Sequence, residues 1–281
     1  MTDVIHLAHS PDSDDAFMFY ALAAGKVDVD GVEYVHELQD IESLNQRALR
    51  GELEVTAVSI HAYAYLADRY ALLSHGASMG DGYGPRLVTR SAMGKDDLRG
   101  RRIGVPGPLT SAYLALRLYQ PDFEPVFMPF DKIDQAVLAG EVDAGLLIHE
   151  GQLTYASQGF HLVADMGEWW FDETGLPLPL GGNVIRKDLD ERLKRKVSGH
   201  LRESIAYGLG HRADALDHAM RYARGLARGD ADTFVGMYVN DWTLDYGERG
   251  REAIRLFLAR GVEAGIIPHP VTVEFVDDRP T

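Results

Sequence analysis

The chain has 281 residues and a formal net charge of −15, from 43 acidic and 28 basic side chains. Such an acidic chain repels phosphate backbones and anionic lipids, which disfavours nucleic-acid binding and a membrane-surface role. It contains no cysteine, which excludes disulfides, thiolate nucleophiles and Cys-based metal sites. Hydrophobic residues make up 46% of the chain, enough to build the cores of two lobes.

The N-terminal segment becomes acidic early, with Asp12, Asp14 and Asp15 close together. A secretory leader needs an apolar run of roughly 7–15 residues, and a membrane-spanning helix needs about 20. The sequence offers no such run, so we expect a cytoplasmic protein without a membrane partner.

Short apolar segments alternate with helical ones through the first third of the chain. Strands are predicted at residues 4–8, 32–38 and 55–59. Helices are predicted to begin at Asp12 or Ser13, at Asp40 and at Ser59, the last running through Ala67. This alternation predicts a parallel sheet.

A second alternating set follows a glycine-rich turn over residues 76–84. Its strands are predicted at residues 86–90, 102–106, 126–128, 144–148 and 161–164, and its helices at 110–119 and 131–138. Residues 175–182 are expected to be extended and 183–185 to form a return strand. The remainder is helical, with Val197, Leu201, Ile205 and Leu209 recurring every four residues.

This order of elements predicts an α/β protein of two lobes. The chain leaves the first lobe, builds a second and returns, so the large lobe comprises residues 1–88 and 183–281 and the small lobe 89–182. The crossover segments near 87–89 and 179–185 then form the hinge. Proteins built in this way bind a ligand between the lobes, at the carboxyl ends of the strands.

Thr110 and Ser111 stand where a strand of the small lobe turns into a helix. The unpaired backbone N–H groups and the dipole of a helix N-terminus favour an anion, so these hydroxyls fit a pocket for a substrate carboxylate. A hydroxyl at this position can equally cap the helix without touching a ligand. Ser59, at the end of strand 55–59, has the same two interpretations.

His149 follows the predicted strand 144–148, at the edge of the sheet where the cleft is expected. An imidazole titrates near neutral pH and can accept a proton from carbon or oxygen, which makes His149 a candidate base. The chain has 11 histidines, most of them ordinary surface or core residues, and position is what distinguishes His149.

The three N-terminal aspartates do not form a calcium loop, because Phe17 and Ala23 occupy the positions that require Gly and Glu. Helix capping explains these aspartates better, and we predict no metal site. The pair Trp169 and Trp170 fits either a cleft wall or the core.

Several strings together carry a resemblance to a known family. They are Ser10-Pro11 with Asp14-Asp15, Phe17 and Phe19, then Ile148-His149-Glu150 with Thr154-Tyr155, Trp169-Trp170, and Thr-Gly-Leu-Pro-Leu-Pro-Leu-Gly over 174–181. Over nearly its whole length the chain resembles the menaquinone biosynthesis family of the futalosine pathway. Within that family it is most similar to the 1,4-dihydroxy-6-naphthoate synthases.

The resemblance implies a periplasmic-binding-protein-like (type II) fold with a ligand cleft between the lobes. It also implies a lyase that converts cyclic dehypoxanthinyl futalosine, a small substrate bearing a carboxylate, to 1,4-dihydroxy-6-naphthoate. The family reaction uses no metal and no organic cofactor. By the same resemblance, His149 is the proton acceptor, Thr110 and Ser111 contact the ligand, and Ala57, Val58 and Ser59 line the site.

The chain departs from the family pattern at three places. Ala57 stands where some members carry Lys, His9 replaces an aromatic residue, and residues 12–14 read Asp-Ser-Asp where Cys-Pro-Asn is common. Two alternatives stay open: the chorismate dehydratase of the same pathway, and a non-catalytic protein that binds a small carboxylate. The sequence does not define the oligomeric state.

Overall fold

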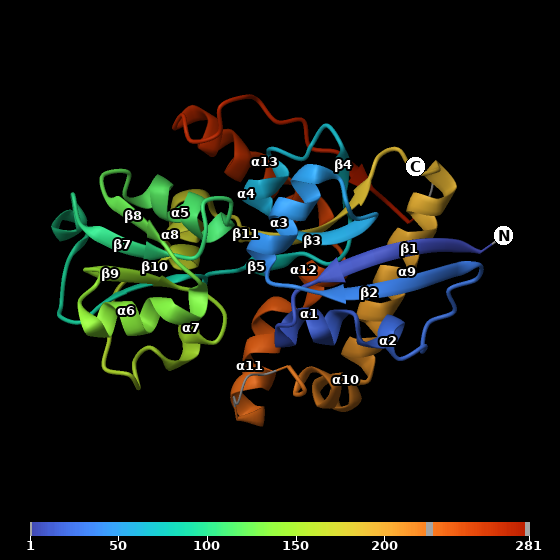
Figure 1. The fold of residues 1–281 in the computed structure, drawn as a ribbon, viewed down its shortest axis with the longest axis horizontal. Coiled ribbons are helices and arrows are strands. Elements are labelled where there is room, and N and C mark those ends of the chain that lie inside the picture. The colour runs from blue at the N-terminus through green and yellow to red at the C-terminus, as the bar shows by residue number, and fades with distance from the viewer. Residues whose placement is uncertain (1, 223–226, 279–281) are drawn as a thin grey trace.

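The computed structural model describes residues 2–222 and 227–278, and its strands form two separate sheets (Figure 1). The strands of the larger sheet are β1 (Asp3–His9), β2 (Val32–Leu38), β3 (Val55–Ser59), β4 (Tyr70–Leu73), β5 (Ser78–Gly80), β11 (Leu178–Arg186) and β12 (Phe275–Val276). The strands of the smaller sheet are β6 (Arg86–Thr89), β7 (Arg102–Val105), β8 (Glu124–Phe127), β9 (Ala144–Leu147) and β10 (His161–Asp165).

Helices surround both sheets (Figure 1). Those on the side of the larger sheet are α1 (Ser13–Met18), α2 (Tyr20–Ala23), α3 (Ile41–Arg50), α4 (Ile60–Tyr63), α9 (Glu191–Gly210), α10 (Arg212–Ala219), α11 (Arg228–Tyr238), α12 (Asp241–Leu244) and α13 (Gly247–Glu263). Those on the side of the smaller sheet are α5 (Ser111–Tyr119), α6 (Ile133–Ala139), α7 (Gly151–Thr154) and α8 (Met166–Thr174), with 3₁₀ turns η1 (Lys95–Leu98) and η2 (Phe130–Lys132).

The larger sheet has the order β12-β4-β11-β3-β1-β2, with β5 paired to β11. β1 pairs in parallel with β2 and with β3, which confirms the parallel arrangement predicted for the start of the chain. The carboxyl ends of β1 and β3 therefore lie at one edge of the sheet. β11 runs antiparallel to β3 and β4, because the chain re-enters this sheet from the other one. The short strands β4, β5 and β12 were not predicted from the sequence.

The smaller sheet has the order β10-β6-β9-β7-β8. β7 pairs in parallel with β8 and β9, whereas β6 runs antiparallel to both β9 and β10. The carboxyl ends of β7 and β9 consequently lie at the same edge, and the predicted residues at both ends are brought to it.

Two predicted helices differ from the structure, one in its end and one in its start. Ser59 opens only the short helix α4, and hydrogen-bonded turns replace the predicted continuation to Ala67, because the chain must reverse in time to begin β4 at Tyr70. Asp131 does not start α6 but lies within the 3₁₀ turn η2, and α6 begins at Ile133.

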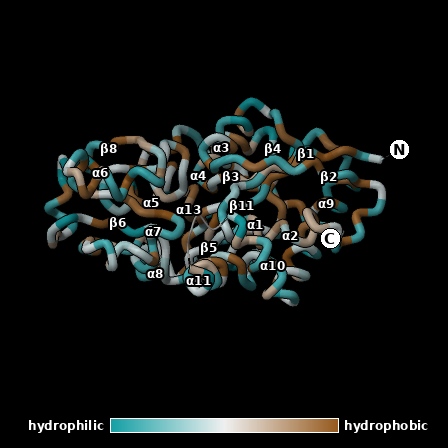
Figure 2. The backbone as a smooth tube through the Cα atoms, turned by 60° about the horizontal axis from the view of Figure 1, so that its bottom comes forward, coloured by the Kyte–Doolittle hydropathy of each residue, from teal (hydrophilic) through white to brown (hydrophobic). Residues whose placement is uncertain are grey.

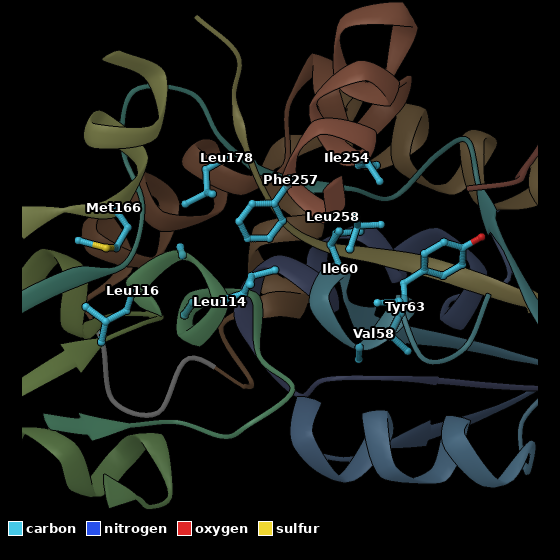
Figure 3. Close-up of a cluster of buried hydrophobic side chains, with 14 of the residues drawn as sticks. Val58, Ile60, Tyr63, Leu114, Leu116, Met166, Leu178, Ile254, Phe257 and Leu258 are labelled. Atoms are coloured by element: carbon cyan, nitrogen blue, oxygen red, sulfur yellow. The ribbon is translucent and has the colours of Figure 1, made fainter. Parts of the chain in front are cut away.

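The largest hydrophobic cluster spans both sheets. It contains Ile60 of α4, Leu114 of α5 and Phe257 of α13, which Figure 3 shows close together. Trp170 belongs to this cluster and packs edge-to-face on Phe257, with ring centroids 5.3 Å apart, so it is a core residue rather than a cleft wall. Trp169 is partly buried against the same cluster.

Figure 2 shows hydrophobic residues concentrated along the strands and in the middle of the molecule, with hydrophilic residues in the outer loops. Within residues 2–222 and 227–278, no helix combines the length and apolar character needed to cross a membrane. The lobe boundaries proposed from the sequence, 88/89 and 182/183, remain a prediction. They fall inside β6 and β11, strands that belong to different sheets.

Candidate active site

A cavity lies between the two sheets and holds about 750 Å³ of empty space, part of it open to solvent. The carboxyl ends of β1, β3 and β9, the N-terminus of α5 and parts of β11 and α11 form its walls. Its polar lining comprises Ser10, Asp14, Asp15, Ser59, Ser78, Thr110, Ser111, His149, Gln152, Asn183 and Tyr238. Ala57 and Val58 line it as well, so the structure brings together every site residue predicted from the sequence.

Thr110 caps α5, which is one of the two roles that the sequence allowed for its hydroxyl. Its Oγ1 accepts a hydrogen bond from the Tyr113 N–H (3.3 Å) and donates one to the Gly107 carbonyl (2.9 Å). A hydroxyl has a single proton to donate, so the Thr110 hydroxyl has none left for a ligand in this arrangement. The backbone N–H groups in the first turn of α5 are therefore the main anion-binding feature at this point.

The Ser111 hydroxyl lies beside Thr110 and is used differently. Its Oγ accepts a hydrogen bond from the His61 N–H at the start of α4 (3.1 Å), which leaves its own proton available. His61 Nδ1 lies 3.3 Å from the Thr110 carbonyl oxygen. These two contacts join α4 to α5 across the edge of the cavity. Burial lowers the pKa of His61 to about 4, so the ring is neutral near pH 7.

Ser59 ends β3, and the amide of Asn45 in α3 fixes it. Asn45 Nδ2 donates to Ser59 Oγ (3.2 Å), and Asn45 Oδ1 accepts from the Ser59 N–H (3.0 Å). The Ser59 side chain makes no capping hydrogen bond to α4, so its hydroxyl proton is available to a ligand. Ala57 presents only a methyl group to the same wall.

The backbone of His149 is unusual. Its φ is +52°, and it is the only residue other than glycine with a positive φ in the part of the chain that the structure describes. The left-handed region is uncommon for non-glycine residues, although histidine is among those enriched there. Such conformations cluster at functional sites, where the surrounding structure imposes them. Here the left-handed residue forms the turn between β9 and α7.

The His149 ring has two different environments at its two nitrogens. Nδ1 lies 3.4 Å from Oδ2 of Asp12, whereas Nε2 is buried and has no hydrogen-bond partner among the described residues. The Phe130 ring packs against the imidazole, with centroids 4.5 Å apart. A proton held on Nδ1, facing the carboxylate, leaves the Nε2 lone pair available to accept another.

The role predicted for Asp12 is only partly right. Asp12 occupies the N-cap position of α1, but its side chain makes no capping hydrogen bond and instead meets His149. Its neighbours Asp14 and Asp15 lie in the first turn of the helix, both buried and both in the cavity lining.

The carboxyl groups of Asp14 and Asp15 both have pKa values above the ordinary value of an aspartate. Burial, and then the charge of Asp15, holds the pKa of Asp14 well above its ordinary value. Burial raises the pKa of Asp15 to about 6, although its carboxylate accepts a hydrogen bond from the Ser10 N–H (2.9 Å). Near neutral pH this corner of the cavity therefore combines a carboxyl group that favours its protonated form, Asp14, with an ionised one, Asp15.

Gln152 supports the turn that carries His149. In either orientation of its amide, one end hydrogen-bonds the Tyr238 hydroxyl at 2.7 Å. In the orientation that satisfies both ends, the amide nitrogen donates to the Gly84 carbonyl (2.7 Å) and the oxygen accepts from the His149 N–H (3.2 Å). Gln152 thus ties the strained residue to α11, on the other side of the cavity.

Two other chemistries find no support at this site. Across the described residues, no group of three or more His, Asp or Glu side chains is placed to hold a metal ion. The stretch Gly76-Ala-Ser78-Met-Gly80 matches the sequence of a nucleophile elbow. However, Ser78 begins the short strand β5 rather than standing at a strand-to-helix turn.

Comparison with known proteins places the chain in a family. A family model described as menaquinone biosynthesis matches residues 5–263. The chain belongs to this family. Its relatives in menaquinone biosynthesis include two proteins named 1,4-dihydroxy-6-naphthoate synthase. The one from Thermus thermophilus is 42% identical, covering 96% of this chain and 100% of that protein, and the one from Streptomyces coelicolor is 40% identical, covering 95% of each. The chain is thus an enzyme of menaquinone biosynthesis.

Solved structures agree on the fold of this menaquinone biosynthesis enzyme. A crystal structure of a protein from Archaeoglobus fulgidus superposes with a TM-score of 0.89 at 50% identity, covering 94% of this chain and 98% of that one. The alkanesulfonate-binding protein from Xanthomonas axonopodis pv. citri superposes with a TM-score of 0.71 at 14% identity, covering 96% of each chain. The two-lobed periplasmic-binding-protein-like fold with a cleft between its lobes is confirmed.

Several residues that shape this site in the menaquinone biosynthesis enzyme were not predicted from the sequence. Asn45 carried one usable signal, because it is an amide on the buried face of α3 between Leu44 and Ala48. Gln152 and Tyr238 carried none, since each resembles an ordinary helical residue until the fold brings the two together.

Proposed function

We propose that this menaquinone biosynthesis enzyme is a lyase that converts cyclic dehypoxanthinyl futalosine to 1,4-dihydroxy-6-naphthoate, with His149 as the proton acceptor. The observation that carries the proposal is the His149 ring: Nδ1 faces a carboxylate, while the buried Nε2 has no partner among the described residues. The names of the two curated relatives, each a 1,4-dihydroxy-6-naphthoate synthase, support the same product.

His149 has the features of a general base. Elimination of the cyclic, sugar-derived part of the substrate begins when a base removes a proton from an acidic carbon. Nε2 accepts that proton, and the resulting imidazolium is stabilised by the Asp12 carboxylate beside Nδ1. Closing the cavity excludes water from the reacting groups.

The N-terminus of α5 supplies the recognition of the substrate carboxylate. No Lys or Arg occurs among the described residues that line the cavity, so an anion must be held by dipoles and hydroxyl groups. The first backbone N–H groups of α5 and the hydroxyl protons of Ser111 and Ser59 are the available donors. Thr110 contributes by capping the helix that presents these N–H groups.

The direct test is product formation from purified protein and cyclic dehypoxanthinyl futalosine, followed by chromatography. The matching variant is His149→Asn, because asparagine tolerates a left-handed backbone, whereas alanine there costs about 1–2 kcal/mol. We expect turnover to fall by about 10²–10⁴-fold with the melting temperature unchanged, the usual contribution of a general base. His269→Asn, at an exposed histidine, is the control.

Each result has a definite meaning. If His149→Asn turned over substrate almost as fast as the wild type, the proposed role of His149 would be contradicted. If the wild type did not convert the compound at all, the proposed substrate would be wrong. Chorismate consumption, and binding of small carboxylates without turnover, would then be measured to separate the two remaining alternatives.

A further inference from the structure

Asp12 and His149 come from opposite sides of the cavity and meet beside it. Asp12 precedes α1, on the side of the larger sheet, whereas His149 follows β9 of the smaller sheet. Nδ1 of His149 lies 3.4 Å from Oδ2 of Asp12, and the two side chains are only 17% and 3% exposed. A charge interaction in such surroundings is screened less by water and salt than one at the surface.

The Asp12 carboxylate does not serve the helix that it precedes. Only the backbone carbonyl of Asp12 takes part, accepting a hydrogen bond from the Ala16 N–H (2.9 Å). α1 is held instead by Ala16 and Phe17, which pack among apolar residues of α10 and α11. Burying a carboxylate costs free energy, so a buried carboxylate that does not cap its helix points to another use.

We propose that Asp12 is a positioning residue for the base: it fixes the His149 ring and keeps the ring proton on Nδ1, so that Nε2 offers its lone pair to the substrate. This inference deepens the proposed function and rests on it. A carboxylate paired with a catalytic histidine acts in this way in other enzymes, where its loss leaves the imidazole in the wrong tautomer.

The same pair connects closure of the cavity to chemistry. Because one partner comes from each side, any opening that separates the sheets also separates the base from its carboxylate. Gln152 and Tyr238 form a second link across this gap, with a hydrogen bond of 2.7 Å. The base is therefore fully assembled only in the closed state, which is also the state that excludes water.

Other charged groups around His149 are few and identifiable. Asp14 and Asp15 lie in the first turn of α1, and Glu150 follows His149 in the chain. The aromatic neighbours, Phe130 of η2 and Phe234 of α11, carry no charge. Of the carboxylates in the described residues, only that of Asp12 forms an ion pair with the ring within 4.0 Å. Neutralising Asp12 removes this pairing, and it also removes one of the charges that raise the pKa values of Asp14 and Asp15.

The test uses Asp12→Asn, which keeps the size of the side chain and is an equally good N-cap. ¹⁵N NMR of the imidazoles in the substrate-free protein reports the tautomer of His149, with His149→Asn used to assign its signals. We expect the Nδ1–H form to dominate in the wild type and to lose that dominance in Asp12→Asn.

Turnover supplies the second readout. We expect kcat of Asp12→Asn to fall by about 10–10²-fold, less than on loss of the base itself, with a small change in KM. Asp12→Glu restores part of the rate. Asp96→Asn, at a side chain 89% exposed, is the control for a change of charge.

Two outcomes would overturn the inference: an unchanged His149 tautomer in Asp12→Asn, or an unchanged kcat of that variant. If Asp12→Asn does not fold, Asp12→Ser replaces it, since serine is also a good N-cap. Failure of the wild type to convert the substrate would contradict the proposed function alone. The NMR comparison needs no turnover and would still decide whether Asp12 sets the tautomer.

Discussion

Asn45 holds Ser59 through both ends of its amide: Nδ2 donates to Ser59 Oγ (3.2 Å) and Oδ1 accepts from the Ser59 N–H (3.0 Å). The amide is fully buried, so these bonds do not compete with water. α3 thereby fixes the end of β3 at the cavity, and with it a hydroxyl whose proton is available to the substrate.

We predict that Asn45→Ala weakens both stability and substrate binding. It leaves the buried Ser59 N–H without its partner, at a cost of about 1–3 kcal/mol in the free energy of unfolding. It also frees the Ser59 hydroxyl to rotate, so KM should rise by about 10-fold while kcat changes less. Urea denaturation and steady-state kinetics measure the two effects.

Gln46→Ala on the exposed face of the same helix is the matched control, and we expect it to change stability by less than about 0.5 kcal/mol. An equal loss of stability in both variants, or an unchanged KM in Asn45→Ala, would contradict the role assigned to Asn45.

The fold was predictable where the pattern was local. The apolar run at Val55–Ser59 and the strand Val32–Leu38 have the predicted bounds, because each is a short buried or alternating segment with clear ends. The strands Ser78–Gly80 and Phe275–Val276 were missed, because segments of three and two residues have no period to detect. The predicted helix after Ser59 was too long, since only the tertiary position of β4 requires the chain to reverse there.

The site was predictable as a set of positions but not as a set of roles. The rule that ligands bind at the carboxyl ends of strands was enough to select His149, Ser59 and Thr110. The same local pattern allows a hydroxyl to cap a helix or to contact a ligand, and only the coordinates show Thr110 donating to Gly107. The pairing of Asp12 with His149 joins two distant loops, which no local pattern reports.

Ser111→Ala and Thr110→Val should affect different properties, the first mainly substrate binding and the second mainly stability. Ser111→Ala removes a donor proposed for the substrate carboxylate and the acceptor of the His61 N–H, so KM should rise by about 10-fold or more. Thr110→Val removes a cap, so the main effect should be a loss of about 1 kcal/mol in stability. KM and the urea midpoint of each variant measure this. The reverse order would indicate that Thr110, not Ser111, contacts the substrate.

Gln152→Met should slow turnover by releasing the turn that carries His149. The variant loses the bonds to Tyr238, to the Gly84 carbonyl and to the His149 N–H, so the left-handed backbone at His149 is no longer imposed. We expect a fall in kcat and faster amide hydrogen exchange at His149. Tyr238→Phe removes only one of the bonds, so kcat should fall less and amide exchange at His149 should accelerate less. Unchanged exchange at His149 in Gln152→Met would contradict this support.

Asp14→Asn should stabilise the protein in a pH-dependent way. The pKa of Asp14 is raised in the folded state, chiefly by burial and then by the charge of Asp15. A carboxyl group with a raised pKa contributes most stability below its unfolded value, near 3.8, and loses that contribution as the pH rises through the folded value. Ionised Asp14 therefore destabilises the folded protein at alkaline pH, and its amide replacement does not.

We expect the melting temperature of Asp14→Asn to exceed that of the wild type at pH 8 and the difference to shrink as the pH falls to 4. Each kcal/mol recovered raises the melting temperature by roughly 2–4 °C in proteins somewhat smaller than this one. Calorimetry at pH 4, 6 and 8 measures the trend, with Asp30→Asn, at a side chain 88% exposed, as the control. A difference of the same size at every pH would show that packing, rather than ionisation, is responsible.

Because Asp14 lines the cavity, the stabilised variant should also turn over substrate more slowly, the usual cost of relieving strain at a functional site.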